Sequence, residues 1–230
     1  MKDFMSKTLW IIANWKSNKT IAEALEWVSK VGPNLHFREN IKVVVCPEFD
    51  AIVEVKKAVQ VGGWKLEVGA QDLSPFRAGA YTGEEAAQNL SQLISLSILG
   101  HSERRQNFGE TDEMVAKKVD QARQNNIIPL VCVQGKETLV PEGCKLIAYE
   151  PVFAIGTGNP DTPENANQVA KFLRKQHGHD AEILYGGSVN HENAKAFVQQ
   201  ESISGLLIGK SSLDPEEFLQ IVNICIESNV

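Results

Sequence analysis

The sequence has few cysteines, no long apolar run and a shortage of basic side chains, and each lack excludes a class of protein. Its four cysteines form no CxxC pair, so neither a zinc site nor a disulfide framework is predicted. No stretch reaches the roughly 18 consecutive apolar residues of a membrane helix, and no secretory signal is recognised. With 23 Lys and Arg against 29 Asp and Glu, the formal charge of −6 disfavours non-specific nucleic-acid binding. We expect a cytoplasmic protein that binds neither membranes nor nucleic acid.

Short β-branched runs alternate with segments of helical period along the chain. The runs are continuously apolar, which is typical of strands buried on both faces. They occupy residues 9–13, 42–46, 66–70, 96–99, 127–133, 145–149, 182–184 and 203–208. Eight such units predict one α/β domain over residues 1–230, a closed (β/α)8 barrel. An open doubly wound sheet is the alternative, because periodicity alone does not show closure.

One of the eight units is too short for an ordinary helix. Between Val133 and Lys145 the chain has only QGKETLVPEGC, which contains Pro141 and Gly143. A complete parallel crossover needs at least about 10–12 residues. We therefore expect the fifth helix to be shortened or missing, with an irregular loop or a single helical turn in its place.

Polar side chains and glycines follow five of the apolar runs. They are Asn14, Lys16, His101, Glu103 and Glu150, with two glycine turns, YGGS at 185–188 and GKS at 209–211. In a barrel the carboxyl ends of the strands share one rim, where active sites are built. Each residue alone has an ordinary explanation, such as a surface lysine or a hydrogen-bonded histidine. Their convergence on one rim indicates an active site.

Two of these features suggest specific chemistry. Glu150 directly follows the apolar LIAY, so we expect a partly buried carboxylate with a raised pKa that can act as a base. The glycine turns expose backbone N–H groups that can hold a phosphate.

Two segments resemble motifs but are better explained by structure. Residues 205–211, GLLIGKS, are one residue short of a P-loop, and their centre is a predicted strand. His177 to Asp180, HGHD, follows a helix, so Gly178 is interpreted as its C-terminal cap and no metal site is predicted.

Four strings of residues resemble the triosephosphate isomerase family. They are ANWKSN at 13–18, LGHSERR at 99–105, AYEPVFAIGTG at 148–158 and YGGSV at 185–189. They extend, in order, over nearly the whole chain, and HSERR with YEPVxAIGTG is highly specific. The resemblance implies a TIM barrel of glycolysis and gluconeogenesis. It further implies metal-independent interconversion of dihydroxyacetone phosphate and D-glyceraldehyde 3-phosphate through an enediolate, without an organic cofactor.

The resemblance also implies roles for individual residues. Glu150 is the base, and His101 is a neutral imidazole that polarises the carbonyl. Asn14 and Lys16 hold the substrate, and Glu103 supports Lys16. The phosphate-binding positions are Gly156, Ser188, Gly209 and Lys210. The closing lid is Pro151, Val152, Phe153, Ala154, Ile155, Gly156, Thr157 and Gly158, ending near Asn159.

The loop between residues 71 and 83 carries aromatic side chains among small residues. Phe76 and Tyr81 would expose apolar surface on a free loop, which usually marks an interface. In the family this loop inserts beside Asn14 and Lys16 of a twin subunit. We therefore expect a homodimer through the loop from Phe76 to Thr82.

The chain departs from the family pattern at three site positions. Lys210 stands where a second glycine is usual, and we expect its backbone to hold the phosphate while its side chain turns outward. Phe153 replaces a tryptophan of the lid, and Asn159 replaces a frequent lysine. The alternatives are a catalytically silent barrel that binds phosphate or a partner protein, and another phosphate-binding barrel enzyme such as an aldolase. An aldolase needs a Schiff-base lysine inside the barrel, which Lys16 at a strand end does not match.

Overall fold

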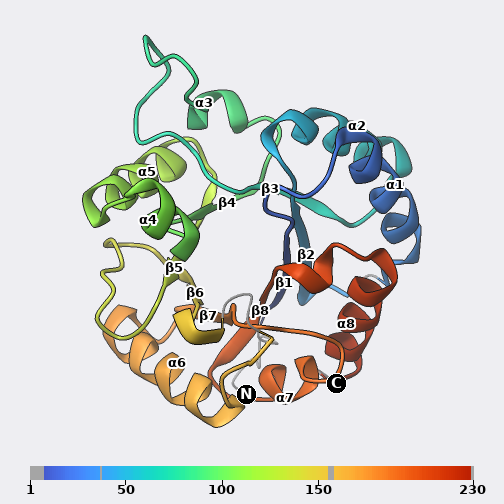
Figure 1. Cartoon of the computed structure of the whole chain (residues 1–230), viewed down its shortest axis with the longest axis vertical. Helices are drawn as coiled ribbons and strands as arrows, with labels where there is room; N and C mark the ends of the chain where they lie inside the picture. The colour runs from blue at the N-terminus through green and yellow to red at the C-terminus, as the bar shows by residue number, and fades with distance from the viewer. Residues whose placement is uncertain (1–7, 37, 155–157, 229–230) are drawn as a thin grey trace, which may run out of the picture.

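Eight parallel strands form a closed barrel in a computed structural model that describes residues 8–36, 38–154 and 158–228. Each strand pairs with its neighbours in chain order, and β8 pairs with β1 (Figure 1). The strands are Leu9–Asn14 (β1), Ile41–Cys46 (β2), Glu67–Ala70 (β3), Leu96–Leu99 (β4), Ile128–Val133 (β5), Leu146–Tyr149 (β6), Glu182–Tyr185 (β7) and Ile203–Ile208 (β8). Closure confirms the predicted barrel and excludes the open sheet.

Helices surround the barrel as an outer ring (Figure 1). They are Ile21–Val31 (α1), Ile52–Gly62 (α2), Ala87–Leu90 (α3), Ser102–Phe108 (α4), Asp112–Gln124 (α5), Pro163–His177 (α6), Ala194–Val198 (α7) and Pro215–Ser228 (α8). Short 3-10 turns are Gly32–Asn34 (η1), Phe49–Ala51 (η2), Val152–Ala154 (η3) and Lys210–Ser212 (η4). Threonine caps begin three of the helices, because their hydroxyls accept otherwise unpaired N–H groups. These caps are Thr20, Thr111 and Thr162.

The crossover between β5 and β6 contains no helix, as its length predicts. Residues 134–145, all described, run as turns and irregular loop between α5 and α6 (Figure 1). The ammonium of Lys136 lies 5.3 Å from the ring centroid of Phe172 on α6, and Leu139 is 66% exposed. The missing helix therefore leaves apolar surface exposed on the outer ring.

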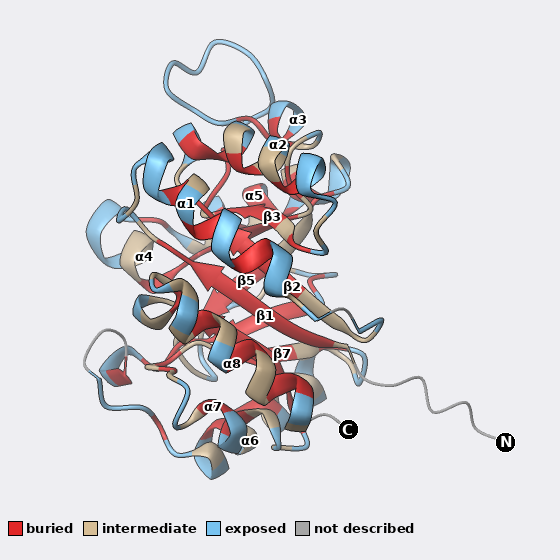
Figure 2. Ribbon diagram, turned by 90° about the vertical axis from the view of Figure 1, so that its right-hand side faces the viewer, coloured by how far each residue is buried: buried red, intermediate tan, exposed pale blue. Residues whose placement is uncertain are grey.

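Two apolar layers explain why the strands read as continuous apolar runs. Trp10 and Ile12 of β1 point into the barrel, where they pack with residues of the other strands. Leu9, Ile11 and Ala13 alternate with them and pack outward against the helices. Figure 2 shows the strands buried along most of their length and the helices buried on their barrel side. Both faces of each strand are covered, so side chains of both faces are apolar.

Three helices differ from the sequence pattern. Residues 84–93 have a helical period in the sequence but form a helix only over Ala87–Leu90, and residues 192–200, which have the same period, form one only over Ala194–Val198. Neither has a side-chain cap at its start, which leaves the first N–H groups without that stabilisation. The helix Ser102–Phe108 gave little periodic signal because it is only seven residues long. Among the described residues, no helix has the length and apolar character that crossing a membrane requires.

Candidate active site

A cavity of about 480 Å³ opens at the carboxyl ends of the strands. Eight of the residues to which the resemblance gives a role line it, namely Asn14, Lys16, His101, Glu150, Gly158, Ser188, Gly209 and Lys210. Glu103 contacts the lining residue Lys16. Gly156 lies outside the described residues, as do Ile155 and Thr157. The structure therefore brings together the predicted catalytic residues and the described phosphate-binding residues at the ends of β1, β4, β6, β7 and β8, whereas the lid residues Pro151 to Ala154 do not line the cavity.

A carboxylate and an imidazole contact each other at the base of this cavity. Oε1 of Glu150 lies 3.0 Å from Nε2 of His101, and the Glu150 side chain is 2% exposed. The N–H of Ser102, the first residue of α4, donates to Oε2 of Glu150 at 3.3 Å. The N–H of Glu103 donates to Nδ1 of His101 at 3.2 Å. An acceptor at Nδ1 leaves the proton on Nε2, which then faces Glu150.

The pKa values of this pair correct one expectation from the sequence. Burial alone raises the pKa of Glu150. His101, the Ser102 N–H and the Cys132 thiol lower it by more than burial raises it, so the pKa lies below its usual value. Burial lowers the pKa of His101, yet the Glu150 carboxylate more than offsets this and raises it. The predicted raised pKa of Glu150 is therefore wrong for the free site. The sequence showed the burial of Glu150 but not its imidazole neighbour.

One contact of His101 still favours the neutral ring. A protonated Nδ1 would place its own N–H against the N–H of Glu103. The helix N-terminus also disfavours a positive charge at this point. Without the Glu150 carboxylate at Nε2, burial, the helix N-terminus and the Lys16 ammonium favour the neutral imidazole, and only the Glu103 carboxylate, 3.7 Å from Nδ1, opposes them.

Lys16 is held at the cavity by both its backbone and its side chain. Its φ of 55° lies in the left-handed region, which is uncommon for a non-glycine residue. Its N–H donates to Oδ1 of Asn14 at 3.2 Å, and its carbonyl accepts from Nε2 of Gln71 at 2.6 Å. Its ammonium lies 2.5 Å from Oε1 of Glu103. These contacts fix one positive charge beside the Glu150–His101 pair.

Glycines of the turn after β7 allow the backbone to approach the cavity closely. A Cβ on Gly186 would lie 2.9 Å from Cγ of Glu150, and one on Gly187 would lie 2.1 Å from the Tyr185 hydroxyl. A Cβ on Gly209 would lie 3.6 Å from Cε of Lys16. The N–H groups of Lys210 and Ser211 have no bond to another described residue. This geometry suits an anion held by backbone N–H groups next to an ammonium.

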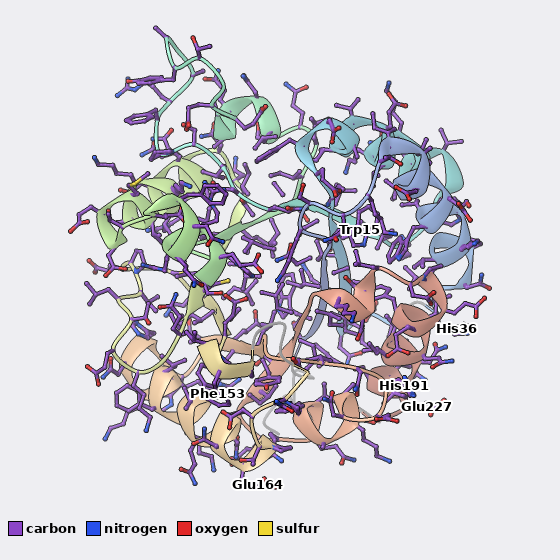
Figure 3. The ribbon with its side chains drawn as sticks, viewed as in Figure 1. Trp15, His36, Phe153, Glu164, His191 and Glu227 are labelled. Atoms are coloured by element: carbon purple, nitrogen blue, oxygen red, sulfur yellow. The ribbon has the colours of Figure 1, made fainter. Side chains whose placement is uncertain are left out.

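The described part of the predicted lid rests on the Ser188 turn. The hydroxyl of Ser188 donates to the carbonyl of Ala154 at 2.6 Å and accepts from the N–H of Gly158 at 3.2 Å. Val152 and Phe153 are exposed, and Figure 3 shows Phe153 on η3 beside the ends of β6 and β7. Both described ends of the lid segment therefore contact the cavity rim through one serine.

Sequence analysis missed three residues that contact the site and a fourth that contacts the tyrosines next to it. Ser102 and Cys132 contact Glu150, Gln71 contacts Lys16, and Asp161 joins the ends of β6 and β7. Gln71 follows β3 directly, so the strand-end rule that found Asn14 would also have found it. Cys132 is buried, but no sequence pattern shows which interior side chain it faces.

The loop between β3 and α3 is exposed and internally organised. The rings of Phe76 and Tyr81 stack with centroids 4.3 Å apart and an interplanar angle of 5°. They are 39% and 44% exposed, on a loop that extends from the barrel (Figure 2).

The sequence matches known proteins over most of its length. The family model described as triosephosphate isomerase matches residues 9–145 and 137–225. A triosephosphate isomerase of Mesomycoplasma hyorhinis is 40% identical and covers 96% of this chain and 99% of the relative. One from Aquifex aeolicus (strain VF5) is 40% identical over 92% of this chain and 97% of the relative. One from Alkaliphilus metalliredigens (strain QYMF) is 38% identical over 93% and 98%.

Proposed function

The chain belongs to the triosephosphate isomerase family and functions as an isomerase of triose phosphates, and on this premise we propose which residues perform the reaction. The observation that carries the assignment is the contact of Glu150 with His101 beside the Lys16 ammonium, in one cavity. A barrel that only bound phosphate or a partner would not need these three groups together. We therefore place the chemistry on them.

Glu150 acts as the base. It takes a proton from the carbon beside the carbonyl of dihydroxyacetone phosphate and returns it to the neighbouring carbon, which yields D-glyceraldehyde 3-phosphate. Bound substrate lies between Glu150 and His101, so their direct contact opens. His101 then becomes the neutral imidazole that polarises the carbonyl through its Nε2–H and moves protons between the two oxygens. The bond from the Glu103 N–H to Nδ1 supports this tautomer.

Lys16 and Asn14 stabilise the negative charge that develops in the reaction. The enediolate carries its charge on oxygen, and a fixed ammonium in a partly closed cavity stabilises it more than water would. Glu103 keeps the Lys16 side chain in place through the 2.5 Å contact. Asn14 orients the Lys16 backbone and contributes an amide to the same cavity wall.

The phosphate binds to backbone N–H groups at the ends of β7 and β8. Ser188, Gly209 and Lys210 supply this part of the site, and Gly156 of the lid completes it. The lid from Pro151 to Gly158 excludes water, because an enediolate phosphate that meets water and rotates freely can lose its phosphate.

The protein acts as a homodimer in the cytoplasm. The loop from Phe76 to Thr82 inserts beside Asn14 and Lys16 of a second copy. Its stacked, exposed Phe76 and Tyr81 rings support this proposal, because that apolar surface is otherwise solvated.

Interconversion of the two triose phosphates in the presence of EDTA tests the assignment. We expect the Glu150→Gln variant to lose about 10³-fold in kcat, within the range typical of a positioned acid–base group. Glu164→Gln is the matched control, because Glu164 is an exposed carboxylate on α6 in the outer ring (Figure 3). A folded Glu150→Gln variant with near wild-type kcat would refute the role of Glu150, and loss of turnover in EDTA would refute a metal-independent reaction.

A further inference from the structure

Asp161 is a buried carboxylate between the lid segment and α6. It is 7% exposed, and its Oδ2 accepts from the Tyr149 hydroxyl at 3.2 Å and from Nδ2 of Asn165 at 2.7 Å. Its Oδ1 accepts from the N–H of Thr162 at 2.8 Å, and its own N–H donates to the Tyr185 hydroxyl at 2.8 Å. Four polar bonds thus converge on one residue that does not line the cavity.

Both tyrosines that bond to Asp161 end a strand, and each directly precedes a residue of the active site. Tyr149 ends β6 and directly precedes Glu150, and Tyr185 ends β7 and directly precedes Gly186 and Gly187. The two residues are register partners in the sheet, and the N–H of Gly186 donates to the Tyr149 carbonyl at 2.8 Å. The orientation of the two strand ends therefore depends on what holds the two phenols.

Helix capping does not account for this arrangement. A buried carboxylate costs free energy unless its bonds replace those with water. Among the described residues, Asp161 has no cation within ion-pair distance, and neutral donors satisfy it instead. Thr162 already caps α6 through its own hydroxyl, so the helix does not require a carboxylate at position 161 for that purpose. Burial and the Asp161 charge raise the pKa of Tyr149, so its phenol remains a donor to the carboxylate.

We propose that Asp161 is a positioning residue for the isomerase: through Tyr149 its carboxylate orients Glu150. The proposal rests on the base role of Glu150 given above. The backbone of Gly186 packs directly against the Glu150 side chain, because a Cβ at Gly186 would lie 2.9 Å from Cγ of Glu150. A shift of the β6 or β7 end therefore moves the carboxylate relative to the substrate carbons.

Misplacement of Glu150 should increase the loss of phosphate from the enediolate, which a smaller amount of folded protein would not do. After the first proton transfer, the enediolate either regains a proton from Glu150 or expels its phosphate. In the expulsion the C–O bond breaks and its electron pair leaves with the phosphate. Slower reprotonation gives the expulsion more time. The ratio of inorganic phosphate released to triose phosphate isomerised therefore reports on the position of Glu150, and it does not depend on the fraction of enzyme that is active.

Three variants test the proposal: Tyr149→Phe, Asp161→Asn and the double variant. Tyr149→Phe keeps the ring and removes one donor, so it is the variant that best preserves the fold. Asp180→Asn is the matched control, because it is the same change on an exposed carboxylate just beyond the C-terminal end of α6. Thermal unfolding verifies that each variant is folded at the assay temperature, and kcat, KM and released phosphate are measured for each.

We expect kcat to fall about tenfold or more in both single variants, since misplacement by about 1 Å can cost a hundredfold. KM should change less than kcat, and the ratio of phosphate to isomerisation should rise several-fold. The double variant should be little worse than the poorer single variant, because both act through one bond. An unchanged ratio in both single variants overturns the proposal, whatever happens to kcat. Wild-type turnover in Glu150→Gln, measured in the same series, would instead refute the base role.

Discussion

Oε1 of Glu150 and Nε2 of His101 lie 3.0 Å apart inside the barrel rim, and each changes the proton affinity of the other. The carboxylate raises the pKa of the imidazole, and the imidazole lowers the pKa of the carboxylate. The free site therefore differs in protonation behaviour from a site in which substrate separates the two groups. This relationship makes the two residues one titrating unit before substrate binds.

Removal of the Glu150 charge should lower the pKa of His101. In Glu150→Gln the carboxylate that raises this pKa most is gone, while burial and the Lys16 ammonium, which both lower it, remain and outweigh the smaller effect of the Glu103 carboxylate. NMR titration of ring-labelled histidines measures the change, with the other four histidines as internal references. An unchanged or higher pKa of His101 in the variant would contradict this interpretation of the contact.

Lys210 should contribute to substrate affinity through its charge. It lines the cavity, its side chain is exposed, and no described carboxylate lies within ion-pair distance of its ammonium. We expect Lys210→Gln to raise KM about threefold to tenfold with little change in kcat, and to weaken the salt dependence of kcat/KM. Lys175→Gln, at the far end of α6, is the matched control. A large gain in affinity for Lys210→Gly would show instead that the lysine obstructs the phosphate.

The barrel was predictable because its strands are covered on both faces. A run such as LWIIA in β1 is apolar at every position, because Trp10 and Ile12 fill the interior while Ile11 and Ala13 pack against the helices. Such a run is typical of a strand buried on both faces. The loss of the helix between β5 and β6 was predictable from the small number of residues between those two strands. The brief α3 and α7 were not, because whether a weak helical pattern forms a long helix depends on caps and packing rather than on period.

The site was predictable where a residue lies at the carboxyl end of a strand. Asn14 ends β1, Glu150 directly follows β6 and His101 follows β4 after Gly100, so the barrel topology brings them to one rim. Contacts between side chains from distant strands were not predictable. The opposite pKa shift of Glu150 comes from His101, 49 positions earlier in the sequence, and the Asp161 bonds depend on the paired ends of β6 and β7.

A buried ion cluster should make Lys118 important for stability. Lys118 is 2% exposed; its Nζ lies 2.7 Å from Oδ2 of Asp72 and contacts Glu110, and Nε of Arg104 lies 2.8 Å from Asp72. Lys118→Met leaves two buried carboxylates with less positive charge, which should cost about 3–5 kcal/mol of unfolding free energy at about pH 7. Urea unfolding measures the loss, and the exposed neighbour variant Lys117→Met serves as the control.

The same variant should show a defined pH dependence. Burial raises the pKa of Asp72 and Lys118 opposes the rise, so Lys118→Met should raise this pKa further. A raised carboxyl pKa means that the folded state binds a proton at a pH where the unfolded state does not. Stability relative to wild type should therefore recover as pH falls from about 7 to about 5. A deficit that stays constant or grows over this range would show that the loss comes from packing.

The loop from Phe76 to Thr82 should join two copies of the chain. Phe76→Asp places a charge where we propose that the stacked ring meets the partner, so it should convert a particle of twice the 25.4 kDa chain mass into a monomer by sedimentation velocity. It should also lower kcat about tenfold or more, because Gln71 at the root of this loop holds the Lys16 carbonyl and a released loop weakens that support. Leu139→Asp introduces the same charge on the exposed fifth crossover and should leave both properties unchanged. A wild-type chain that sediments as a monomer at micromolar concentration would refute the dimer, and a fully active Phe76→Asp monomer would separate the dimer from the chemistry.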